Sequence, residues 1–78
     1  MQKLLKWLKA HEAKIERFDE DVYEVSGTIN DKRFSVSGFA PVRGSSNKVV
    51  GYIAWIGKER NNHCLSQQSV IGFIESKL

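Results

Sequence analysis

Two histidines and one cysteine are the side chains of this chain that could carry out chemistry near neutral pH. An imidazole titrates in that range and can act as a general base, and a thiolate is a nucleophile. His63 and Cys64 are neighbours in the chain, whereas a Cys–His catalytic pair needs facing side chains and a third group that orients the base. His11 lies among apolar residues, which favours a partly buried structural histidine. We therefore expect no catalytic residue and no enzyme.

Metal-ligand and phosphate-loop patterns are not found either. The two histidines and the cysteine would have to converge from opposite ends of the chain and recruit a carboxylate to hold a metal ion. The acidic run 19–21, with Glu24, lacks the alternating ligands and the glycine of a calcium loop, so we interpret it as a solvated turn. The six glycines are scattered and form no phosphate-cradling loop. The sequence thus predicts no metal, no cofactor and no small-molecule substrate.

A helix is the first element that the hydrophobic pattern predicts. It is expected over residues 3–18, where Ala, Leu, Lys and Glu dominate. At 100° per residue one narrow face collects the apolar side chains Leu4, Leu8, Ile15 and Phe18.

Three strands are expected in the middle of the chain. Residues 22–29 alternate between apolar and polar side chains, as in a half-buried strand. The dipeptide 30–31, Asn-Asp, suits a two-residue hairpin because both residue types tolerate the left-handed region. The second strand begins near Arg33, and the third covers residues 48–56.

A polar loop and a second helix are expected at the end of the chain. Residues 57–65 form the loop, and Ser66 is a good N-cap for a helix with Val70 and Ile74 on its buried side. The predicted fold is α+β, with the order α-β-β-β-α. Short connections favour a three-stranded antiparallel meander with both helices packed on one face.

Composition supports one small globular domain over residues 1–78. With 41% hydrophobic and 27% charged residues, disorder is not expected. A lone cysteine forms no internal disulfide and fits a reducing compartment, so we expect a cytoplasmic protein. No apolar run approaches the roughly 20 residues of a membrane span. The first helix could lie on an anionic membrane, but its apolar face is needed for the core, so a membrane is not an expected partner.

The third strand indicates where a partner could bind. Residues 48–56 are apolar on both alternating faces, whereas helices on one side of a sheet cover only one of them. Either a partner or second chain covers the other face, or the sheet is more strongly curled than a simple meander. The sequence leaves two alternatives for the uncovered side: Tyr52 with Ile56, or Val49, Ile53 and Trp55.

A protein-binding module is the leading functional hypothesis. The predicted docking face of the sheet carries Phe39, Tyr52 and Ile56. The partner would be another protein that this domain regulates, inhibits or links, or a second copy in a homodimer.

Nucleic acid is the alternative partner. The net charge is +3, and phosphate contacts need charge more than defined geometry. One basic face of the first helix and the basic loops around the sheet would supply the contacts. The basic residues 32–33 are counted with these loops. The predicted residues are Lys3, Lys6, Lys14, Arg17, Arg43, Lys48, Lys58 and Arg60.

Overall fold

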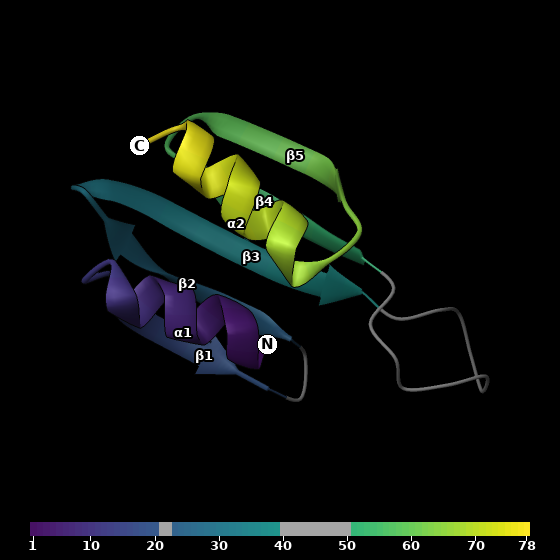
Figure 1. The fold of residues 1–78 in the computed structure, drawn as a ribbon, viewed down its shortest axis with the longest axis horizontal. Helices are drawn as coiled ribbons and strands as arrows, with labels where there is room; N and C mark the ends of the chain where they lie inside the picture. Colours follow the sequence, from purple (N-terminus) through teal and green to yellow (C-terminus); the bar gives the residue numbers. More distant parts are fainter. Residues whose placement is uncertain (21–22, 40–50) are drawn as a thin grey trace.

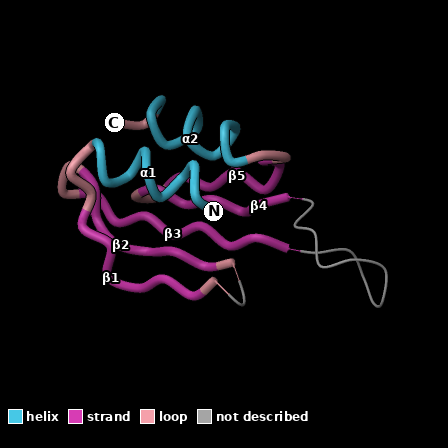
Figure 2. Tube along the Cα trace, turned by 60° about the horizontal axis from the view of Figure 1, so that its bottom comes forward, coloured by secondary structure: helices cyan, strands magenta, loops and turns pink. Residues whose placement is uncertain are grey.

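The computed structural model describes residues 1–20, 23–39 and 51–78, which form two helices and one five-stranded antiparallel sheet. Neighbouring strands in the sheet are also neighbours in the chain, in the order β1-β2-β3-β4-β5. Both helices lie on the same face of the sheet (Figures 1 and 2). The elements are α1 (Gln2–Ala10), β1 (Lys14–Asp19), β2 (Glu24–Ile29), β3 (Lys32–Phe39), β4 (Gly51–Ile56), β5 (Glu59–Cys64) and α2 (Gln67–Ser76).

The α+β class and the antiparallel arrangement of the strands are confirmed, but the expected three-stranded sheet is wrong because the sheet has five strands. The two additional strands, β1 and β5, form its edges. They arise from segments whose residue patterns predict a helix and a loop. The expected strand residues 22 and 48–50 lie outside the described part of the chain.

The predicted helix over residues 3–18 is wrong beyond Ala10. The chain turns at Glu12, whose φ of 60° is incompatible with a continuing helix. The backbone N–H of Ala13 returns to the carbonyl oxygen of Leu8 at 2.9 Å, which closes the helix end. The next residues then begin β1.

A β-bulge explains why the apolar residues of β1 have the spacing that is typical of a helix. Ile15 and Phe18 are three residues apart, so they would lie on opposite faces of a regular strand. The register of β1 against β2 shifts between Ile15 and Arg17, so that Ile15 pairs with Gly27 and Phe18 with Val25. The extra residue of the bulge thereby places both apolar side chains on the face that the helices cover.

The segment 57–65 forms a turn and an edge strand rather than a loop. Gly57, with φ of 58°, begins the turn from β4 into β5. The side chains of β5 are mostly polar and exposed, as is usual for a strand at a sheet edge. A register shift opposite residues 52–54 also interrupts the alternation of β5. Its hydrophobic pattern therefore resembles that of a loop.

The predicted hairpin at residues 30–31 is confirmed. Asn30 and Asp31 have φ values of 50° and 63°, and the flanking Ile29 and Lys32 are directly paired. Two consecutive residues in the left-handed region form the tight turn that matches strand twist.

One hydrophobic core lies between the sheet and the helices. Each helix contributes one apolar face, and the sheet contributes the side that faces them. The buried residues are Leu4, Leu8, Val25, Ile29, Phe34, Val36, Tyr52, Ala54, Ile56, Cys64, Val70, Ile71 and Ile74.

Hydrogen bonds at the start of α2 fix that helix and join it to α1. The predicted N-cap Ser66 is confirmed, because its Oγ accepts the backbone N–H of Ser69 at 3.1 Å. The side chain of Gln67 accepts the backbone N–H of Leu4 at 2.8 Å through Oε1. This bond satisfies a first-turn donor of α1 that has no partner within its own helix.

Candidate functional site: the open face of the sheet

The side chains that could perform chemistry do not come together. Cys64 is 1% exposed, and burial raises the pKa of its thiol, which keeps it protonated near neutral pH. His63 is exposed, and its backbone N–H donates to Oδ1 of Asn61 at 2.8 Å. His11 stacks on Trp7 at the end of α1, with 4.2 Å between the ring centroids. The His11 ring is exposed, so the prediction that it is partly buried is wrong.

The acidic cluster is spread over a hairpin. Asp19 and Glu24 are directly paired at one end of β1 and β2, Glu20 follows β1, and Asp21 lies outside the described residues. Within residues 1–20, 23–39 and 51–78, no group of three or more His, Cys, Asp or Glu side chains is placed to hold a metal ion. The described part of the chain thus offers no metal centre.

Two of the three residues predicted on the docking face belong to the core. Tyr52 is 7% exposed and Ile56 is 1% exposed, on the side that the helices cover, so their predicted location is wrong. Alternation along β4 places Ile53 and Trp55 on the opposite side. Phe39, the third predicted residue, is 44% exposed on that side. The sequence alternative that contains Ile53 and Trp55 is therefore the correct one for β4.

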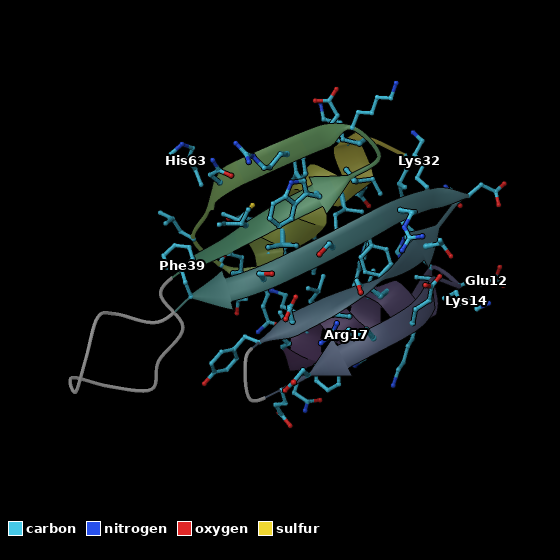
Figure 3. All side chains as sticks on the ribbon, turned by 180° about the vertical axis from the view of Figure 1, so that it is seen from behind. Glu12, Lys14, Arg17, Lys32, Phe39 and His63 are labelled. Atoms are coloured by element: carbon cyan, nitrogen blue, oxygen red, sulfur yellow. The ribbon has the colours of Figure 1, made fainter. Side chains whose placement is uncertain are left out.

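The sheet side opposite the helices is named the open face, because neither described helix crosses it (Figure 3). A single row of directly paired residues traverses all five strands on this face. It has an arginine at each edge of the sheet, two serines in the middle and a tryptophan beside one arginine. We call it the arginine row: Arg17, Ser26, Ser35, Trp55 and Arg60.

Shorter rows lie on either side of the arginine row. Toward the hairpin at residues 30–31, a second basic row consists of Lys14, Thr28 and Arg33. Toward the other end of the strands lies a row with two carboxylates, a hydroxyl and an apolar side chain. That row consists of Asp19, Glu24, Ser37 and Ile53. Among these three rows, the basic side chains therefore occupy the middle row and the row nearest the hairpin, and the two carboxylates occupy the row farthest from the hairpin.

Phe39 lies beyond the row with the two carboxylates, at that end of the open face. It is directly paired with Gly51, and the ring lies over that glycine. A Cβ at Gly51 would approach the ring carbon Cζ of Phe39 to 2.6 Å, so only glycine leaves room for the ring in this position. Phe39 and Trp55 are the two aromatic side chains that we assign to this face.

The residues predicted to form a basic helix face lie on opposite sides of the molecule. Lys3 and Lys6 are exposed on α1, in the helical layer. Lys14 and Arg17 are in β1 and belong to the open face (Figure 3). The predicted basic helix face is therefore wrong, because the segment that carries two of its four residues is a strand.

The remaining predicted basic residues also separate. Lys58 is in the turn between β4 and β5, and Arg60 is in the arginine row. Arg43 and Lys48 lie outside the described residues. Arg33, expected at the start of the second strand, lies in β3 and joins the second basic row.

Neither α1 nor α2 is long and apolar enough to cross a membrane. Comparisons of the chain with protein-family models, with curated proteins and with solved structures found no match.

Proposed function

We propose that this chain is a non-catalytic binding module whose open face binds nucleic acid. The observation that supports it is the arginine row, which combines basic side chains with an aromatic ring across the whole sheet. Arginine contacts phosphate oxygens in a planar, bidentate geometry. An aromatic side chain beside it can stack on a base. Both parts of a nucleotide thus have a complementary group on one surface.

The distribution of charge on the open face favours a polyanion. Lys14, Arg17, Arg33 and Arg60 are all exposed. Asp19 and Glu24 share the face but lie at the far end of β1 and β2. The positive potential near the two basic rows is therefore only partly offset. The net charge of +3 also attracts an anionic partner to the whole molecule.

A protein partner is the second candidate, and the apolar side chains Phe39, Ile53 and Trp55 favour it. A protein interface typically buries about 800 Å² on each partner, and its centre is depleted of charged residues. Ile53 and Trp55 are half-buried, and the neighbouring positions on the face are serines and charged residues. A second copy packed face to face could set its acidic row against the basic rows, but each copy has four basic and two acidic side chains in the named rows, so positive charge would remain in excess. These features favour nucleic acid over a protein or a homodimer.

Two charge-reversal variants test the proposal. Arg17→Glu with Arg33→Glu alters the open face, and Lys3→Glu with Lys6→Glu makes the same change of charge on the helical layer. Binding of fluorescently labelled DNA and RNA, single-stranded and duplex, is measured by anisotropy at low and moderate salt. We expect the open-face variant to bind about tenfold more weakly or worse, and the helical-layer variant to bind within about twofold of the wild type.

The proposal also predicts that affinity falls steeply with salt, because binding releases counterions from the phosphates. It is contradicted if the wild type binds none of the four nucleic acids at low salt, or if the two variants lose affinity equally. Equal losses would indicate attraction by net charge alone. Absence of binding would make a protein the favoured partner of the open face.

A further inference from the structure

We infer that the ligand of the open face is single-stranded nucleic acid, held with bases on Trp55 and Phe39 and with phosphates on the two basic rows. This inference rests on the proposed function and specifies the form of its ligand. It follows from the width of the sheet, the position of the aromatic rings and the small side chains between them.

The width of the open face argues against a duplex. The arginine row spans four inter-strand steps of about 4.8 Å, or about 19 Å in all. The major groove of B-form DNA is only about 12 Å wide and admits one helix or a two-stranded ribbon. A five-stranded sheet cannot enter it, and both helices lie on the opposite side of the molecule. A duplex of B-form geometry would therefore meet this face through its phosphates, and its bases would stay paired and stacked, away from the aromatic rings.

The aromatic rings are placed to receive unpaired bases. Trp55 is half-buried in the arginine row, where its neighbours are the small Ser35 on one side and the phosphate-binding candidate Arg60 on the other. Phe39 is more exposed and lies over Gly51, four residues before Trp55 on β4. Four residues of strand span about 13 Å. About four stacked nucleotides at about 3.4 Å each would cover this distance.

Small hydroxyl side chains form the floor between these groups. These side chains are shorter than those of the arginines and the aromatic residues, so a nucleic-acid strand can approach the backbone of the sheet closely. Their hydroxyls can donate to phosphate oxygens and can donate to or accept from base edges. The described residues of this kind on the open face are Ser26, Thr28, Ser35 and Ser37.

Tryptophan fluorescence of single-tryptophan variants tests the inference. Trp7→Phe leaves Trp55 as the reporter, and Trp55→Phe leaves Trp7, on the helical layer, as the control. Each variant is titrated with twelve-nucleotide oligo-dT and oligo-rU and with a duplex of about the same length. We expect saturable quenching of Trp55 by a single strand, no quenching of Trp7, and duplex binding about tenfold weaker or worse.

Truncation of the rings adds a second measurement. Trp55→Ala should weaken single-strand binding by about 5- to 150-fold, the range that stacking of one base provides. Circular dichroism establishes that the variant is folded, and the quenching of Trp55 does not depend on that variant. Duplex binding as tight as single-strand binding, with Trp55 unquenched, would overturn this inference and leave the proposed function intact. No binding of any nucleic acid would overturn both.

Discussion

The ring of Phe39 occupies the space that a side chain at Gly51 would need, since a Cβ there would lie 2.6 Å from the ring carbon Cζ. The two residues are directly paired between β3 and β4. The two nearest atoms belong to the far end of the flexible Phe39 side chain, and the backbone carbonyl oxygen of Cys64 follows at 3.3 Å. Gly51→Ala should therefore displace the ring and destabilise the fold by less than about 2 kcal/mol.

The displaced ring should also weaken single-strand binding several-fold. A double-mutant cycle with Phe39→Ala separates this effect from others, because Gly51→Ala should have little further effect on binding once the ring is removed. Additive losses of binding free energy would contradict a role for the ring position. Anisotropy supplies the affinities, and urea denaturation supplies the free energies of unfolding.

Gly27→Ala, unlike Gly51→Ala, should strongly destabilise the fold. A Cβ at Gly27 would overlap the backbone carbonyl oxygen of Lys14 and lie 3.1 Å from the backbone nitrogen of Glu16. These atoms belong to the bulged strand β1, so they can move only if β1 shifts away from β2. We expect the free energy of unfolding to fall by about 3 kcal/mol. A loss below about 1 kcal/mol by urea denaturation would show that β1 does not approach β2 as described.

The hydrogen bond between the helices predicts a difference between two adjacent glutamines. Gln67→Ala removes the acceptor of the Leu4 N–H, which should lower the free energy of unfolding by about 1 kcal/mol. Gln68→Ala makes the same truncation at the next, exposed position and should change it by less than about 0.5 kcal/mol. Thermal or urea unfolding of the two variants measures this difference. Equal effects would mean that the bond does not stabilise the helical layer.

Stability should decrease in alkaline solution. Burial raises the pKa of Cys64 above 9.0, and burial together with the nearby Tyr23 raises the pKa of Tyr52 above 10.0. The unfolded chain loses these protons at lower pH than the folded chain. The contribution of these groups is therefore constant below their ordinary pKa values and falls as the pH rises past them.

Urea denaturation between about pH 8 and 10.5 should show this decrease, and Cys64→Ala should reduce it. Alkylation of the thiol by iodoacetamide should be much slower in the native protein than in urea. A free energy of unfolding that rises over this range, or equally fast alkylation in both states, would contradict the buried position of Cys64.

The hairpin between β2 and β3 and the start of α2 could be predicted from the sequence, because residue type and structure agree there. Asn30 and Asp31 form the tight turn, and Ser66 forms the helix cap, that their residue types favour. The edges of the sheet could not be predicted in this way. Ile15 and Phe18 have the spacing of a helical face, and only the pairing of β1 with β2 shows that a bulge produces it.

The candidate site was harder to predict than the fold because it depends on which side of each strand faces the helices. The apolar residues of β4 fit either side, so nothing local assigns Trp55 rather than Tyr52 to the open face. Arg17 and Arg60 lie in the two strands that the sequence did not predict. Their place in one row follows from the sheet register, which is a long-range property.

The most direct test of the central claim is chemical-shift mapping of the ¹⁵N-labelled protein during titration with oligo-dT. Binding on the open face predicts the largest changes at the amides of residues 17, 26, 35, 55 and 60 and at the indole N–H of Trp55. Changes concentrated on α1 and α2, around Lys3, Lys6 and Gln68, with the arginine row unaffected, would contradict it.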